Sequence, residues 1–320
     1  VRSWAAEDGV AALEYVWLLR TTTHEREQLA VDVLLRAGVS DVLFSDGPKL
    51  SFLDTASKQV IMSGLAVKMQ QELGLVTQAA RLLYEANDYP ALCSLLVNEI
   101  SSQLIKAPHL NPQAQLQPVG GAFQMGVGPS VPGASAAEVA TAEKTFSQLR
   151  SDAAAFLAHW RAKNQAASFG GAAFLEQALS LAAFMSAAAA WRQNRNEGRG
   201  EAQLTAVLAM DLPLLPSEPA AVEEKRADFR LLPVALQRCF PALIEVAMEA
   251  LHAKFTLLRA APAAYAGSSA SAEAYALRSR AEAIVAFSGL AVWAAAEALG
   301  QTHMPGATTK RLAGWLADMA

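Results

Sequence analysis

The sequence predicts an all-α fold, an elongated α-solenoid of stacked antiparallel helices. Apolar residues recur three or four positions apart through most of the chain, which is the spacing of one helix face. Alanine is frequent, and valine and isoleucine fall at helical spacings, so no segment has the alternating pattern of a strand. Very short turns join successive apolar stripes. A hairpin of such helices has two apolar faces, and it can bury both only if other helices pack on each side of it, as they do in a stacked array.

Two helices are expected before residue 50. The first covers residues 5–20 and the second residues 24–37, and Gly38 stops the second because glycine readily takes the backbone conformation of a helix end. Residues 40–44 can add one further turn, and residues 45–49 form a loop.

The stretch Lys58–Lys106 predicts three consecutive helices around which the rest of the chain is organised. Gly74 ends the first helix, and Asn87 ends the second. Asp88 is the expected N-cap of the third, and Pro90 falls in its first turn, where a missing N–H costs little. The second helix carries its apolar stripe on Val76, Ala79, Ala80, Leu83 and Ala86, and the third on Leu92, Leu95, Leu96, Ile100 and Leu104.

Residues 107–135 differ from their surroundings. They hold five prolines and five glycines, no Asp, Glu, Lys or Arg, and no helical period, which predicts a long flexible loop or insertion. The expected organisation is therefore a helical solenoid segment at 1–106, a flexible Gly/Pro-rich loop at 107–135 and a C-terminal helical solenoid segment at 136–320.

Several helices are expected after this loop. They cover 136–165, 172–192, a segment ending at Asp211, 220–232, 234–259 and 272–299. The helix at 172–192 is apolar nearly all round, so it is expected to be central. Pro233 and Pro241 mark a kink or a boundary, since proline lacks the N–H that a helix interior needs.

A terminal helix is expected at Thr308–Met319, with Thr308 or Thr309 as its cap. Its apolar edge is formed by Leu312, Trp315, Leu316 and Met319, at the spacing i, i+3, i+4, i+7. Two interpretations compete for this edge. It either closes the open end of the array by packing on the helix that ends at Leu299, or it stays partly exposed and binds a partner protein.

Composition limits the function. The chain has 320 residues, of which 53% are hydrophobic and 18% charged, so it can bury a large core. Its 26 basic and 30 acidic residues give a net charge of −4, which argues against direct nucleic-acid binding. Cys93 and Cys239 lie within apolar stripes, which favours reduced, buried thiols over a disulfide. The chain begins with Val1, and we expect it to be an internal or C-terminal part of a longer protein.

No membrane span is expected. The apolar runs Ala178–Trp191 and Ala283–Ala296 are each shorter than the ~20 residues that a bilayer requires.

No catalytic, cofactor-binding or metal-ligating residue is predicted, and the chain is not expected to be an enzyme. The glycine-rich run Gly120–Gly133 lacks the Gly-Lys-Ser/Thr of a phosphate-binding loop. His24-Glu25 opens like the helix of a zinc peptidase, but Gln28 stands where the second histidine is needed. The five histidines are scattered, and there is no Gly-x-Ser-x-Gly nucleophile elbow.

Three stretches, in the same order and spacing, resemble one known family. The sequence GLVTQAARLLYEANDYPALCSLLVNEISSQL at 74–104 resembles a segment of the nucleoporin-interacting-component family, whose members are coatomer-like α-solenoid scaffolds. ALEYVWLLR at 12–20 is similar to the helix that precedes this segment, and residues 222–259 and 278–290 are similar to the closing helices.

The resemblance implies a structural scaffold of the nuclear pore inner ring, at the nuclear envelope. It would bind other nucleoporins, both scaffold and linker nucleoporins, and support pore assembly and the transport of protein and mRNA. It also implies that this sequence is the C-terminal part of the protein. The family's N-terminal coiled-coil region, which docks onto channel nucleoporins, has no counterpart here.

A second hypothesis belongs to another class of protein. The alanine-rich helices Ala172–Arg192 and Ala272–Leu299 could line an apolar pocket, as in a helical enzyme or ligand-binding domain. Close helix packing explains the same alanines without a ligand.

Overall fold

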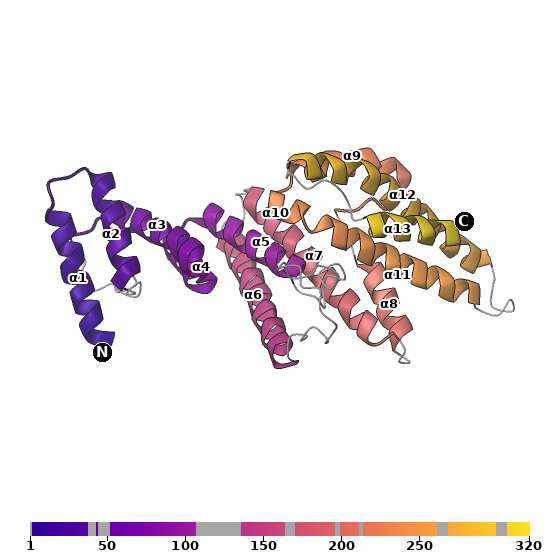
Figure 1. Cartoon of the computed structure of the whole chain (residues 1–320), viewed down its shortest axis with the longest axis horizontal. Coiled ribbons are helices and arrows are strands. Elements are labelled where there is room, and N and C mark those ends of the chain that lie inside the picture. The colour runs from indigo at the N-terminus through magenta and orange to yellow at the C-terminus, as the bar shows by residue number, and fades with distance from the viewer. Residues whose placement is uncertain are drawn as a thin grey trace, which may run out of the picture. The chain divides into compact units, whose positions relative to one another are not determined.

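The computed structural model describes residues 2–37, 43, 52–106, 136–163, 170–195, 199–210, 214–260, 268–298 and 306–320. Every regular element within these ranges is a helix, which confirms the all-α prediction. The chain divides into two units, Val1–Glu99 and Ile100–Ala320. Figure 1 follows the helices of both units in chain order.

The first unit consists of consecutive helices, and the first four of them each pack on the next one (Figure 1). They are α1 (Arg2–Leu18), α2 (Thr23–Ala37), α3 (Thr55–Leu73), α4 (Val76–Glu85) and the first part of α5 (Tyr89–Lys106). Contacts join α1 to α2, α2 to α3 and α3 to α4. Their buried faces repeat the predicted stripes and include Leu13, Val16, Ala30, Leu34, Ile61, Leu65, Ala79 and Leu83.

Local hydrogen bonds explain where α2 begins. The Thr22 hydroxyl accepts from the Glu25 N–H at 3.3 Å, and the Glu25 carboxylate accepts from the Thr22 N–H at 3.0 Å. This reciprocal pair is a capping box, which satisfies two amides that would otherwise lack partners. The backbone hydrogen bond from Thr22 holds the pKa of Glu25 below its usual value.

The turn between α4 and α5 confirms the predicted caps. Asn87 has φ of +57°, and its N–H donates to the Tyr84 carbonyl at 3.0 Å. The N–H of Asp88 donates to the Leu83 carbonyl at 3.0 Å, which completes a Schellman motif. The Asp88 carboxylate then accepts from the Ala91 N–H at 3.2 Å and so caps α5. Gly74, with φ of +66°, ends α3 as predicted.

The second unit continues through the rest of the chain. After the end of α5 it contains α6 (Ala136–Lys163), α7 (Gly170–Gln193), α8 (Gly200–Ala209), the 3₁₀ turn η3 (Pro219–Ala221), α9 (Val222–Leu231), α10 (Val234–Gln237), α11 (Phe240–Ala260), α12 (Ser268–Ala298) and α13 (Gly306–Asp318). Helix α11 packs against α7, α8, α12 and α13, and nearly every residue of its first half is buried. Ring contacts between Phe229, Phe240 and Phe287 join α9, α11 and α12, with ring centroids 4.6–6.0 Å apart.

Two predicted helix boundaries are wrong. The expected helix at 234–259 is two helices, the single turn α10 and the long α11, because Pro233 precedes the first and Pro241 lies in the first turn of the second. Proline has no N–H to donate but fits a first turn well, so both prolines mark boundaries and neither is a kink. The terminal helix α13 begins at Gly306, so Thr308 and Thr309 lie inside its first turn and are not its N-cap.

Helix α7 bears on the expected absence of a membrane span, which remains a prediction. The apolar run Ala178–Trp191 is part of a longer helix, and Gly171–Gln193 could cross a membrane by length and composition alone. Half of its most apolar window is buried inside the protein, and a core helix passes the same test. Its buried residues include Leu175, Phe184 and Trp191, and it packs against α6, α8 and α11.

The cysteines are confirmed as free, buried thiols. Burial raises the pKa of both Cys93 and Cys239 to about 12, and the Cys239 thiol donates to the Ser101 carbonyl at 3.6 Å. The expected turn at 40–44 lies outside the described residues apart from Leu43, which is buried. Residues 107–135 also lie outside them, so the predicted division of the chain at 107–135 remains a prediction.

Candidate protein-binding sites

The predicted apolar edge of α13 is only partly exposed. Leu312 and Met319 are 2% and 1% exposed, whereas Trp315 and Leu316 are half-buried. The helix packs on both α11 and α12. Two of the four candidate residues therefore belong to the core of the second unit, and the other two present part of their surface to solvent.

Polar contacts fasten α13 near its middle and at its C-terminal end. Arg311, near the middle, pairs with Glu245 of α11 at 2.7 Å, and Glu245 is only 2% exposed. At the C-terminal end, Arg259 donates to the carbonyl of Asp318 at 3.2 Å and Arg278 donates to that of Ala320 at 3.0 Å. Cationic side chains next to the last carbonyls of a helix also interact favourably with its dipole.

A ring contact orients Trp315. The indole stacks on His252 of α11, with ring centroids 6.1 Å apart and planes 26° apart. His252 Nε2 also lies 3.4 Å from Asp318 Oδ2. The side chain of Trp315 is thus held between its own helix and α11, an arrangement that favours closure of the array over a free binding edge.

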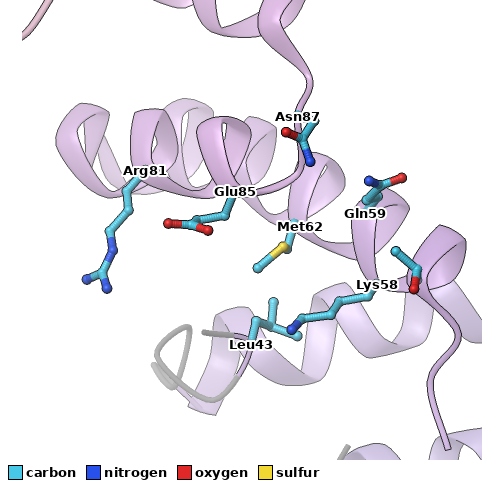
Figure 2. Close-up of a pocket in the computed structure, with 8 residues that line it drawn as sticks. Leu43, Lys58, Gln59, Met62, Arg81, Glu85 and Asn87 are labelled. Atoms are coloured by element: carbon cyan, nitrogen blue, oxygen red, sulfur yellow. The ribbon is translucent and has the colours of Figure 1, made fainter. Parts of the chain in front are cut away.

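A pocket in the first unit brings together residues that sequence reasoning did not single out (Figure 2). Its volume is about 390 Å³, and α3 supplies Thr55, Lys58, Gln59 and Met62 to its lining. Helix α4 contributes Arg81 and Glu85, and Asn87 and Leu43 complete it. Lys58 and Met62 are four residues apart on α3, as are Arg81 and Glu85 on α4. The spacing within each pair indicates that its two residues lie on one face of their helix. The sequence does not show that this face of α3 meets this face of α4.

The structure describes no constellation of groups with obvious chemistry. No group of three or more His, Cys, Asp or Glu that could hold a metal occurs among the described residues. Gln28 Nε2 lies 3.2 Å from His24 Nε2, so the position that would carry a second histidine contacts the first one as an amide. The glycine-rich run Gly120–Gly133 lies outside the described residues.

The alternative pocket between the alanine-rich helices has no counterpart among the described cavities. Helix α7 packs against α6, α8 and α11, whereas α12 packs against α9, α11 and α13. The two alanine-rich helices are thus mainly occupied with other neighbours. The pocket of about 390 Å³ described above is lined mainly by α3 and α4 and contains no residue of α7 or α12.

Comparisons with known proteins agree with this architecture. The family model Nup93/Nic96 matches residues 45–295, well over half of the chain. The solved structures include a match to the crystal structure of Chaetomium thermophilum Nic96 SOL, with a TM-score of 0.58 and 15% sequence identity. That match covers 98% of this chain but 45% of the other, so this chain spans less than half the length of its structural relative. No curated protein matches the sequence.

The structural match confirms the predicted solenoid fold, and the family match confirms the resemblance seen in the sequence. Members of the matched family are scaffold nucleoporins found in the nuclear pore complex at the nuclear envelope. The chain belongs to the Nup93/Nic96 family.

Proposed function

We propose that this chain is a scaffold segment of the nuclear pore inner ring that binds other nucleoporins through the surfaces of its helices. The observation that carries the proposal is the family match over residues 45–295. The stacked helices support it, because such arrays present long surfaces to partner proteins. The proposed partners are inner-ring scaffold and linker nucleoporins, and the proposed role is support of pore assembly and of protein and mRNA transport.

The proposed function involves no catalysis and no direct binding of nucleic acid. The family is structural, and the net charge of −4 supports partners other than a polyanionic nucleic acid. No cofactor is required for a role of this kind.

We also propose that α13 closes the last part of the second unit and that Trp315 and Leu316 add at most a small exposed edge for a partner. The buried Leu312 and Met319 and the pairing of Arg311 with Glu245 support the closing role.

The function can be tested in cells. A fluorescent fusion of this chain should accumulate at the nuclear rim, and its affinity capture should recover inner-ring nucleoporins. A charge reversal at the exposed Glu72, in the last turn of α3, serves as a comparison: Glu72→Lys places a cation near a helix C-terminus and should leave the fold and the localisation unchanged. A diffuse signal with no nucleoporin recovered would contradict the proposal.

A further inference from the structure

Helix α13 buries little apolar surface. Within 309–320, two residues are buried, Leu312 and Met319, two are half-buried, Trp315 and Leu316, and the others are exposed. Helix α11, on which α13 packs, buries nearly every residue of its first half (Figure 1). Because the burial of apolar surface supplies most of the free energy that holds a helix in place, α13 is held less firmly than α11.

Polar contacts supply much of what holds α13 in place. Arg311 pairs with Glu245 of α11 at 2.7 Å, and the last carbonyls of the helix accept hydrogen bonds from Arg259 of α11 and Arg278 of α12. The side chains of Arg311 and Arg278 are each 42% exposed, so water and salt reach these contacts. Interactions of exposed charges weaken as the ionic strength rises, so the docking of α13 is expected to weaken with salt.

The pair of Arg311 and Glu245 differs from an ordinary surface ion pair. Glu245 is only 2% exposed, whereas its partner is largely accessible. A carboxylate buried this deeply loses its hydration, so the docked helix is most stable in the register that places Arg311 against it. Lifting α13 removes this cation and brings water to that side of Glu245 in the same step. The pair therefore favours two arrangements, α13 docked in this register or lifted away, over α13 shifted along α11.

We propose that α13 is a strap that lifts from α11 and α12 as a unit while the rest of the second unit stays folded, and that the pair of Arg311 and Glu245 is its latch. Elements with few buried apolar contacts open at a lower free energy than the core on which they pack. Lifting uncovers Glu245 and His252 on α11 and releases Arg278 of α12 from the Ala320 carbonyl. The inference goes beyond the proposed scaffold function, because it gives the second unit a surface that is covered while α13 is docked.

Gradual fraying is the alternative to opening as a unit. A helix that frays loses its hydrogen bonds progressively from a free end, so amides nearer that end exchange faster. The C-terminal end of α13 is not free, because Met319 is buried there and Arg259 and Arg278 hold the last carbonyls. With fasteners both at this end and at Arg311, the intervening turns are expected to lift together.

Hydrogen exchange of the whole chain, measured by mass spectrometry, tests the strap. Amides of α13 should exchange at one common rate, about tenfold or more faster than those in the first half of α11. Raising NaCl from about 50 mM to about 500 mM should speed exchange in α13 about threefold and leave α11 unchanged. Arg311→Gln should speed it about fivefold and reduce the salt effect, whereas Lys310→Gln, the same loss of charge at an exposed neighbour, should stay within about twofold.

All rates are divided by those of unstructured peptides at the same salt concentration, and exchange in α11 of each variant shows whether the second unit is still folded. The proposal is overturned if α13 exchanges as slowly as α11, or if its rates rise gradually toward Ala320 as in fraying. Equal effects of Arg311→Gln and Lys310→Gln also overturn it. If Arg311→Gln unfolds the whole unit, the wild-type chain decides: a salt effect confined to α13 supports the strap, and a salt effect shared with α11 overturns it.

Discussion

At the scale of single residues, the two faces of α4 differ sharply in their tolerance of substitution. Leu83 is 3% exposed, whereas Glu85 is exposed. Leu83→Asp places a carboxylate among apolar side chains, so we expect it to lower the free energy of unfolding by about 3 kcal/mol or more. Glu85→Ala should change it by about 0.5 kcal/mol or less. Urea unfolding of both variants measures the difference, and equal stabilities would mean that the assigned faces are wrong.

The two cysteines provide a residue-scale test of burial. The pKa of each thiol is raised to about 12, so both remain protonated at neutral pH, and a protonated thiol is a poor nucleophile. We expect neither Cys93 nor Cys239 to react with a maleimide reagent in the native protein at pH 7, and both to react in urea. Their folded-state pKa values are raised, so their contribution to stability is constant below about pH 9 and declines at higher pH.

Rapid labelling of one cysteine without urea would show that its surroundings open in the native state. A Cys93→Ala variant and a Cys239→Ala variant, each labelled separately, assign the reaction to one thiol.

At the scale of one helix, α13 tests the two interpretations of the terminal apolar edge. Trp315→Ala removes the stack on His252 and part of the packing on α11, so we expect a loss of about 2–3 kcal/mol in the free energy of unfolding. Lys310→Ala, on the exposed side of the same helix, should have almost no effect. Denaturant unfolding followed by circular dichroism measures both variants. Normal stability of Trp315→Ala, combined with loss of a nucleoporin partner in affinity capture, would instead favour a binding edge.

The elements also show what a sequence can predict. Helices with a clear apolar stripe and a local cap, such as α4 and α5, were predicted with their ends, because Asn87 and Asp88 carry the cap chemistry themselves. The division between α10 and α11 is marked in the sequence by Pro233 and Pro241, but these residues left a kink and a boundary both open, because apolar residues continue through the break. The start of α13 at Gly306 was missed because Thr308 and Thr309 are good caps in isolation.

The pocket of α3 and α4 shows the same limit in a site. In the sequence, each of the two helix faces that line the pocket can be recognised from a pair of residues four positions apart. That the two faces lie next to each other depends on tertiary packing, which the sequence does not show. The apolar edge of α13, by contrast, was visible as a stripe, and only the degree of its burial required the structure.

At the scale of the whole chain, stability is expected to come from contacts between packed helices, which join successive helices in the first unit and also helices far apart in the sequence, such as α9 and α12, in the second. A segment that contributes no apolar stripe should therefore add little to stability. Residues 107–135, between α5 and α6, have that composition, with ten prolines and glycines and no charged side chain. Replacing them by a Gly/Ser linker of equal length should leave the melting temperature within about 3 °C, and a shorter linker should do the same.

Comparing the two linkers separates the identity of the segment from its length. If the equal-length linker already lowers the melting temperature strongly or removes cooperative unfolding, the native side chains of 107–135 pack against the helices. If only the shorter linker lowers the melting temperature, the length of the segment matters and its sequence does not. A linker that is too short would strain the ends of α5 and α6. Loss of nucleoporin capture with unchanged melting would assign a binding role to the segment itself.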